Sequence, residues 1–317
     1  MTACPEHGPP SDPEHRFCEV CGRNLTTGEG RAVAVPTAWL SSRAAGAVCG
    51  GCGSPVDSGD YCDHCGRRRS VGRDHAELDL GTVAAVTDVG RRRRRNEDAV
   101  AVGRAAGVNV AVVCDGVATA SRSDAAAHDA AEAAVEILLA TGSTVGAARA
   151  AAAAARAAAS ASDGDTPPSC TYVSGVVTPD AVTVGWVGDS RAYWLGPEPA
   201  GLTVDDSVAA LLAAGRFLPP TVDADPDSRA LIRWLGADSG DPEPQVVTFR
   251  PTGPGTLLLC SDGLHHYASD PVALTAAVAG PLVDVARRLT DVALGGGGHD
   301  NIAVALLAFP PSGGSLP

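Results

Sequence analysis

Short apolar runs alternate with longer segments of helical hydrophobic spacing from about residue 78 to residue 309. Runs rich in Val, Leu and Ile that end at Gly, Pro or Asp predict β-strands. We expect strands near residues 82–88, 98–103, 108–114, 170–177, 181–187, 191–195, 245–249, 256–260 and 301–308. We expect helices near residues 123–140, 144–161, 205–214, 226–235, 270–279 and 281–293. Strands interrupted by helical pairs indicate an α+β fold with layers of sheets and helices.

The stretch 125–161 consists mostly of alanine and is broken at Thr141-Gly-Ser-Thr144. Alanine has the highest helix propensity, and its small side chain lets a helix pack closely on its neighbours. The pattern therefore predicts two helices packed on a sheet rather than a low-complexity tail. Three cysteines in strand-like runs, Cys114, Cys170 and Cys260, are expected to be small buried core residues.

The first 70 residues lack this patterning and contain many turn-forming residues. Such a segment has too little core to fold without help from a metal. We therefore expect a double zinc ribbon over residues 1–70, made of 1–25 and 47–68 with a connector between them. A linker at 71–77, a large domain at 78–309 and a disordered tail at 310–317 complete the predicted organisation.

The second cysteine cluster contains Cys49-x2-Cys52 and Cys62-x2-Cys65, each pair followed by glycine. A Cys-x2-Cys turn presents two thiolates to one metal ion, and the glycine permits the tight turn. Two such turns this close together predict a four-thiolate Zn²⁺ site. A disulfide is the weaker alternative in a reducing compartment.

The first cluster contains Cys4-x2-His7 and Cys18-x2-Cys21. It predicts a second Zn²⁺ site with three thiolates and one imidazole, in which His15 competes with His7 as the fourth ligand. The two clusters resemble the double zinc ribbon of bacterial multidomain proteins. That resemblance implies two structural Zn²⁺ ions and a module that stabilises the chain or recruits a protein partner.

The chain has 317 residues and a net charge of −13, and every basic residue is arginine. Residues 74–317 carry 16 Arg against 29 acidic residues, which accounts for the whole net charge. An acidic domain disfavours nucleic-acid binding and suits a domain that concentrates cations. No apolar run approaches the ~18 residues of a membrane span, and the first residues do not resemble a signal peptide. We therefore expect a cytoplasmic protein with no membrane association.

Four acidic residues stand at the ends of predicted strands. Asp115 follows the run 110–114, Asp262 follows 256–261, Asp189 follows 182–187, and Asp300 precedes 302–309. A carboxylate at the mouth of a buried strand is costly unless a cation neutralises it. Several carboxylates at one end of a sheet predict a site for a hard divalent metal.

Five consecutive arginines, residues 91–95, come just before Asn96-Glu97-Asp98. Most of such a run is expected to be a solvated charge cluster. The run lies between two predicted strands, however, which places it in a loop over the edge of a sheet. An arginine held beside carboxylate-bound metals can bind two phosphoryl oxygens at once.

These motifs together resemble the metal-dependent protein phosphatases (PPM family, type 2C) over about residues 78–309. The matching segments occur in the family's order: Arg93-x3-Glu97-Asp98, Cys114-Asp115-Gly116, Gly188-Asp189-Ser190-Arg191, Ser261-Asp262-Gly263-Leu264 and Asp300-Asn301. The resemblance implies a four-layer sandwich, with two antiparallel β-sheets flanked by helices. It also implies two Mn²⁺ or Mg²⁺ ions and hydrolysis of phosphoserine and phosphothreonine in proteins, with Ser/Thr kinases among the expected partners.

The resemblance also implies roles at matching positions. Asp115 would bridge both metals, while Asp262 and Asp300 would bind one metal and the Gly116 carbonyl the other. Arg93 would clamp the substrate phosphate. The remaining matches would hold metal-bound waters or support the site: Glu97, Asp98, Asp189 and Asn301.

Two departures from the family pattern affect the expected activity. Val117-Ala118 replaces a more flexible stretch after the first Asp-Gly, and His266 stands where the family places an acid that helps hold a third metal. Asp165 is only a loose match for the other ligand of that third metal. We therefore expect an intact two-metal core with retained but slow catalysis. The rival interpretations are a degenerate phosphatase that binds phosphoproteins and an adaptor built on the zinc ribbons.

Overall fold

The structure is a computed structural model that describes residues 38–43, 64, 74–117, 119–160, 163, 166–213, 215, 230–240 and 242–310. The chain divides into two compact units, Met1–Thr37 and Ala38–Pro317, and the architecture below is that of the second. The predicted zinc ligands lie outside the described residues: Cys4, His7, Cys18, Cys21, Cys49, Cys52, Cys62 and Cys65.

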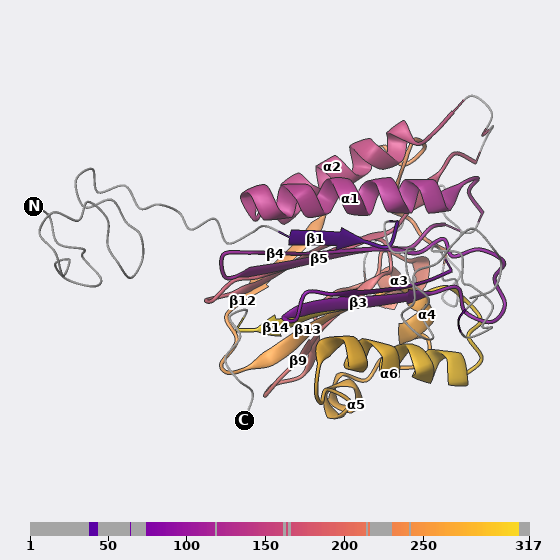
Figure 1. The fold of residues 1–317 in the computed structure, drawn as a ribbon. Coiled ribbons are helices and arrows are strands. Elements are labelled where there is room, and N and C mark those ends of the chain that lie inside the picture. Colours follow the sequence, from indigo (N-terminus) through magenta and orange to yellow (C-terminus); the bar gives the residue numbers. More distant parts are fainter. Residues whose placement is uncertain are drawn as a thin grey trace, which may run out of the picture. The chain divides into compact units, whose positions relative to one another are not determined.

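Two six-stranded antiparallel sheets form the centre of the described part (Figure 1). The first sheet has the order β1 (Ala38–Ser41), β4 (Ala99–Ala105), β5 (Val108–Cys114), β7 (Tyr172–Val177), β8 (Val182–Val187), β12 (Gln245–Phe249). The second has the order β10 (Ala200–Gly201), β9 (Arg191–Leu195), β13 (Gly255–Cys260), β14 (Ile302–Phe309), β3 (Val83–Asp88), β2 (His75–Asp79). A separate short pair joins β6 (Ser169–Cys170) to β11 (Leu235–Gly236).

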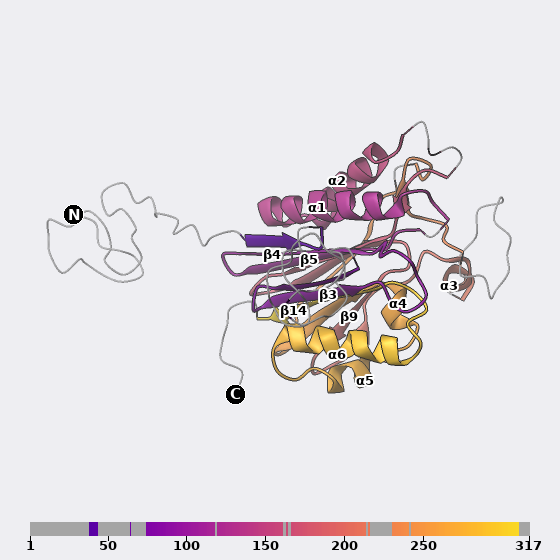
Figure 2. The same ribbon diagram turned by 45° about the vertical axis from the view of Figure 1, so that its right-hand side comes forward.

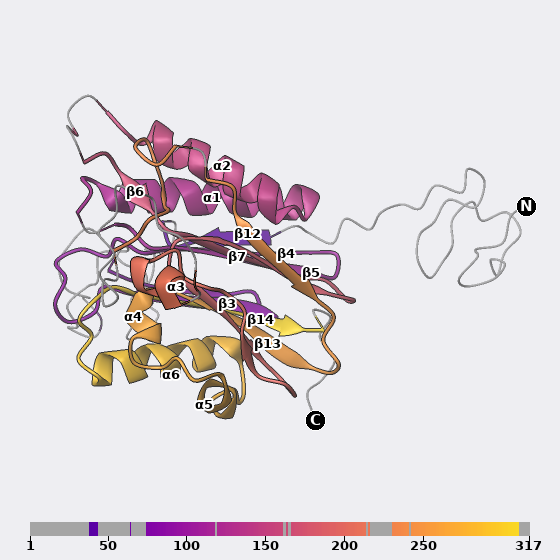
Figure 3. The same ribbon diagram turned by 180° about the vertical axis from the view of Figure 1, so that it is seen from behind.

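Helices cover the outer face of each sheet, so the domain has four layers (Figures 2 and 3). The first sheet carries α1 (Ser123–Thr141) and α2 (Thr144–Ala157), and the second carries α5 (Pro271–Ala276) and α6 (Leu282–Gly295). Two short helices lie near the strand ends, α3 (Val208–Ala213) and α4 (Asp262–His265). The predicted α+β sandwich of two antiparallel sheets with flanking helices is confirmed.

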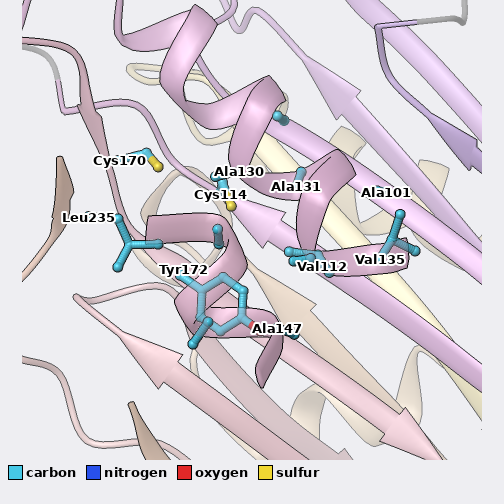
Figure 4. Packing of buried hydrophobic residues seen from close by; sticks show 14 of the residues in the cluster. Ala101, Val112, Cys114, Ala130, Ala131, Val135, Ala147, Cys170, Tyr172 and Leu235 are labelled. Carbon is cyan, nitrogen blue, oxygen red and sulfur yellow. The ribbon is translucent and has the colours of Figure 1, made fainter. Parts of the chain in front are cut away.

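Each interface between layers is apolar. Between the sheets lie Val, Ala, Leu and two tryptophans, with Trp194 meeting Phe249 and Phe309 edge to face. On the outer face of the first sheet, the alanines of α1 approach β4 and β5 closely, as Figure 4 shows around Ala130 and Ala131, while α2 packs on β7 and β8. The alanine-rich stretch is thus a packed layer, as its helix propensity predicts.

Besides the two-residue strands β10 and β11, two strands were not apparent in the sequence pattern. β1 lies in the predicted connector, and β2 begins in the predicted linker. Hydrogen bonds outside the strand pairing also hold β1. The Ser42 N–H donates to the Val100 carbonyl, the Val100 N–H donates to the Ser42 hydroxyl, and the Ser41 hydroxyl donates to Glu132 of α1. Both are short edge strands, whose pairing with β4 and β3 depends on tertiary contacts more than on local hydrophobic pattern.

The predicted helix at 226–235 is wrong in its described part, residues 230–235. Leu231 forms an isolated bridge with Ser207, and Leu235 belongs to β11. Backbone hydrogen bonds to the segment around Asp206 replace helical ones there. None of the helices in the described ranges is long and apolar enough to cross a membrane.

Candidate metal centre

Both sheets contribute acidic residues to one site. Asp98 precedes β4 and Asp115 follows β5 in the first sheet, while Asp262 follows β13 and Asp300 precedes β14 in the second. Their charges interact across the sandwich, since Asp262 and Asp300 both act on the pKa of Asp98 and of Asp115. The two-sheet architecture therefore brings these strand-end carboxylates within electrostatic reach of one another.

These carboxyl groups destabilise one another in their charged form. Burial is the main cause that raises the pKa of Asp98, Asp115 and Asp262 above the usual range, and repulsion between the carboxylates raises it further. An ionised carboxylate in such a place needs a positive partner.

Asp98 is the clearest case of a buried carboxylate that lacks a positive partner among the described residues. Its Oδ2 accepts a hydrogen bond from the Ser261 hydroxyl at 2.7 Å, but its buried Oδ1 has no hydrogen-bond partner in the described part of the chain. The neighbouring Asp115 carboxylate can engage Asp98 only through a shared proton or a cation. All-oxygen donors with an unsatisfied buried atom fit Mn²⁺ or Mg²⁺.

Arg93 supplies a positive charge at the rim. Its Nη2 donates to Asp300 Oδ2 at 2.6 Å, and Asp300 is the main cause that raises the pKa of Arg93. Arg93 and Asp300 are thus brought together, with Asp300 bound to the guanidinium. Among the described residues, no three Asp, Glu, His or Cys side chains are gathered closely enough to form a ready ligand set.

The other arginines of the run differ from Arg93. Arg91, Arg92, Arg94 and Arg95 are exposed, whereas Arg93 is half-buried. The expectation that most of the run is solvated is confirmed. Arg95 contributes instead to the start of α1 through an ion pair of 3.2 Å with Asp124.

Hydrogen bonds fix the Glu97 side chain and the Asp115 peptide. The Glu97 carboxylate accepts from the Ser123 hydroxyl at 2.7 Å, so α1 begins against the site. The Asp115 N–H donates to Thr171 Oγ1 at 3.0 Å, and the Asp115 carbonyl accepts the Thr171 N–H at 2.8 Å. Sequence reasoning did not assign Ser123 or Thr171 to the site, because each acts through a contact with a residue distant in the sequence.

Gly116 is required by close packing. A Cβ at this position would lie 2.8 Å from the Glu97 carbonyl oxygen and 2.9 Å from the Ser123 side chain. The Asp115-Gly116 step therefore brings the backbone against the Glu97 peptide in a way that a side chain would prevent.

Asn301 holds the arginine loop in place. Its Oδ1 accepts the Glu97 N–H at 2.8 Å, and its amide donates to the Val89 and Arg95 carbonyls, each at 2.9 Å. Gly90, with φ of 75°, lies so close to Asp300 that a Cβ would meet its carbonyl oxygen at 2.2 Å. The loops on either side of the site are therefore interlocked.

Asp189 lies within electrostatic reach of the cluster. Burial raises its pKa to about 7, and Asp262 and Asp205 raise it as well. His265 Nε2 donates to the Asp189 carbonyl at 3.0 Å, and burial lowers the pKa of His265 to about 4, which keeps the ring neutral. His265 is a further residue of the site that the sequence pattern did not mark.

Two residues that depart from the family pattern, Val117 and His266, lie in the described part of the chain. His266 is exposed, lies edge to face with Tyr267 at 5.1 Å and acts on Asp262 by its charge. The Val117 N–H donates to the Ser169 carbonyl at 3.0 Å. Ala118 and Asp165 lie outside the described residues. Cys114 is fully buried beside Cys170, as expected of a core thiol (Figure 4).

The family model described as protein phosphatase 2C matches residues 90–295. The chain belongs to the protein phosphatase 2C family. The serine/threonine protein phosphatase PstP of Mycobacterium tuberculosis is 36% identical to this phosphatase 2C domain over 123 residues, which is 38% of the chain and 23% of that relative. The match thus spans less than a quarter of the relative's length.

Solved structures agree on the fold of this phosphatase 2C domain. Serine/threonine phosphatase Stp1 from Staphylococcus aureus aligns with a TM-score of 0.61 at 23% identity, covering 74% of this chain and 98% of that one. The Mycobacterium tuberculosis phosphatase PstP/Ppp aligns with a TM-score of 0.54 at 27% identity over 71% of this chain and 96% of that one. The PstP catalytic domain in complex with 2 manganese ions is 25% identical, with a TM-score of 0.56 and coverage of 71% and 97%.

Proposed function

We propose that the chain is a metal-dependent protein phosphatase that hydrolyses phosphoserine and phosphothreonine esters. Family membership and the likeness to PstP, one of whose solved structures contains two manganese ions, support this assignment. The observation that carries it is the buried, mutually repelling carboxylate cluster with its unsatisfied Asp98 Oδ1. Two Mn²⁺ or Mg²⁺ ions would neutralise this cluster and, when bound, acidify the water that attacks phosphorus.

The position of each acidic residue indicates the role that it would have in binding the two ions and their water. Asp115, with carboxylates of both sheets around it, would bridge the two ions. Asp262 and Asp300 would bind one ion and the Gly116 carbonyl the other. Glu97 and Asp98 would accept hydrogen bonds from bound water, and Ser123 and Ser261 orient these two carboxylates.

Arg93 would bind the phosphoryl group. Its guanidinium already lies at the rim, and its bond to Asp300 leaves further N–H donors for phosphate oxygens. Asn301 would keep the Arg93 loop closed over the strand ends through its three backbone contacts. Asp189 and His265 would support the Asp262 side of the site.

The direct test measures phosphate release from a generic phosphothreonine peptide with Mn²⁺, comparing the wild-type chain with Asp262→Asn. Loss of a metal ligand is expected to reduce turnover by at least about a hundredfold. If the wild-type chain releases no more phosphate than Asp262→Asn does, the enzyme assignment is wrong.

A degenerate phosphatase that binds phosphoproteins without turnover is the second candidate, because His266 places an imidazole next to Asp262. This candidate predicts metal-dependent binding of the same peptide by the wild-type chain with no phosphate release. Replacing His266 by Asp separates the two: faster turnover in His266→Asp means that the position tunes an active enzyme.

Phosphorylated Ser/Thr kinases are among the candidate substrates of the phosphatase domain. We further propose that the cysteine clusters hold two structural Zn²⁺ ions and recruit a protein partner. The support is the ligand spacing in the sequence, which also favours a reducing, cytoplasmic location. Metal analysis after extensive dialysis is expected to find about two Zn²⁺ per chain, and Cys49→Ser is expected to lose one of them.

A further inference from the structure

Tyr267 lies between the short helix α4, which begins with Asp262, and the loop that carries Asp300. It comes just after α4, and its N–H donates to the Leu264 carbonyl at 2.9 Å. Its hydroxyl reaches the other loop, where it lies 2.8 Å from His299 Nδ1 and accepts the His299 N–H at 3.2 Å. One side chain thus joins the helix that begins with Asp262 to the residue preceding Asp300.

The two contacts require a hydroxyl with both donor and acceptor capacity. Because the Tyr267 oxygen accepts the His299 N–H, its own proton is free to be donated to Nδ1 of the same residue. The two rings also lie close together, with centroids 6.2 Å apart and planes tilted by 34°. Packing of a half-buried ring explains the ring contact but not this paired use of the hydroxyl.

The loop on the far side of Tyr267 is rich in glycine and leaves the end of α6, whose carbonyls accept the Gly296, Gly297 and Gly298 N–H groups. Four consecutive glycines, residues 295–298, lead to His299, and two of them adopt positive φ: 131° at Gly297 and 53° at Gly298. Such a run loses more conformational entropy on ordering than any other sequence. The Tyr267 ring fills the space over Gly296, where an added Cβ would lie 2.4 Å from the ring.

The same loop also contacts the arginine loop. The Gly298 carbonyl accepts the Arg91 N–H at 2.7 Å, two residues before Arg93. Beyond its backbone hydrogen bonds to the end of α6, the glycine loop is therefore held from one side by the backbone at Arg91 and from the other by Tyr267. Asp300 follows directly, so its position depends on both contacts.

We propose that Tyr267 is a positioning residue that holds the glycine loop and Asp300 in register with Asp262 for divalent-cation binding. The role in cation binding rests on the proposed function, but the contact between Tyr267 and His299 can be tested without metal. Tyr267→Phe is the sharpest variant, because it keeps the ring over Gly296 and removes only the hydroxyl. Tyr193→Phe is the matched control, since that hydroxyl contacts Arg191 at 3.4 Å and not the glycine loop.

The first measurement is amide hydrogen exchange on the full-length, metal-free chain. Tyr267→Phe is expected to speed exchange several-fold in a peptide covering residues 295–299, where the His299 amide loses its acceptor. Tyr193→Phe is expected to leave that peptide unchanged. Equal exchange in the wild-type chain and Tyr267→Phe overturns the proposal.

The second measurement is a Mn²⁺ titration of the same chains, in which electron paramagnetic resonance counts the free ion. Loss of the hydroxyl is expected to weaken Mn²⁺ binding about three- to tenfold, with the KM for phosphopeptide unchanged. His299→Ala is expected to weaken binding to a similar extent, while His299→Asn, whose Oδ1 can accept the tyrosine proton, retains it.

The outcomes of the titration are distinct. Equal Mn²⁺ affinity in wild type and Tyr267→Phe, or equal losses in His299→Ala and His299→Asn, contradicts the positioning role. Absence of Mn²⁺ binding by the wild-type chain overturns the proposed function, and with it the purpose assigned to Tyr267, whereas the exchange experiment still decides whether the contact orders the loop.

Discussion

Asp98 and Asp206 are equally buried, each with 1% of its surface exposed, yet their surroundings differ. Asp206 is satisfied by the protein: its Oδ2 accepts the Gly188 N–H, and its Oδ1 accepts from Arg233 and Gln245. Asp98 has one hydroxyl donor and several carboxylates as neighbours. The fold can neutralise a buried acid when stability requires it, so the unneutralised cluster around Asp98 indicates a place reserved for cations.

The largest expected effect comes from Asp206→Asn. The NH₂ of the new asparagine would face other hydrogen-bond donors: Arg233, Gln245 or the Gly188 N–H. Because the ion pair with Arg233 is also lost, we expect a cost of about 3 kcal/mol. Thermal unfolding is expected to shift down by roughly 6–12 °C. Asp205→Asn is the control, because the Asp205 side chain is 12% exposed against 2% for Asp206, so its pair with Arg191 is better solvated and the loss should be smaller.

The equivalent substitution at Asp98 is expected to stabilise the metal-free chain rather than destabilise it. Asp98→Asn removes one charge from a repelling cluster while its remaining oxygen still accepts from Ser261. The metal-free chain should become more stable by about 1 kcal/mol, measured by denaturant unfolding in a chelator. A clear loss of stability in Asp98→Asn would mean that the cluster is satisfied without cations, like Asp206.

A smaller effect is expected at His75, where a titratable group pairs with acids outside the site. Hydrogen bonds to Asp88 at 2.8 Å and to Glu77 raise the pKa of His75 to about 9. Because the folded pKa is raised, this stabilisation is complete below about pH 6.5 and is lost as the pH rises through about 9. Partial exposure limits it to less than about 1 kcal/mol.

The measurement for His75 is the free energy of unfolding between pH 6 and pH 9.5. The wild-type chain should lose stability across this window, and His75→Gln, which cannot be protonated, should lose less. The Asp88 carboxylate also accepts the Gly90 N–H at 2.8 Å, so this network lies next to the Arg93 loop. An identical pH profile in both chains would contradict the raised pKa.

The sequence was sufficient for the strand-end acids because they follow or precede long apolar runs. Asp115, Asp262 and Asp300 sit at the ends of β5, β13 and β14, whose hydrophobic pattern is unambiguous. The alanine helices were predictable for the same reason, since propensity and packing agree there.

The parts that sequence reasoning missed depend on contacts between distant residues. β1 and β2 are short edge strands defined by their partners. Thr171, Ser123 and His265 act through hydrogen bonds to residues distant in the sequence, and no periodicity marks such residues. The pairing of Arg93 with Asp300 likewise could not be inferred from two separate motifs.

The central claim, that the carboxylate cluster is a cation site, is tested most directly by calorimetric titration of Mn²⁺ into the metal-free chain at neutral pH. The account predicts saturable binding of about two Mn²⁺ ions and an increase in the unfolding temperature that grows with Mn²⁺ concentration. Asp115→Asn, which lacks the proposed bridging carboxylate, should bind neither ion tightly. Absence of binding and of any thermal shift at millimolar Mn²⁺ in the wild-type chain would contradict it.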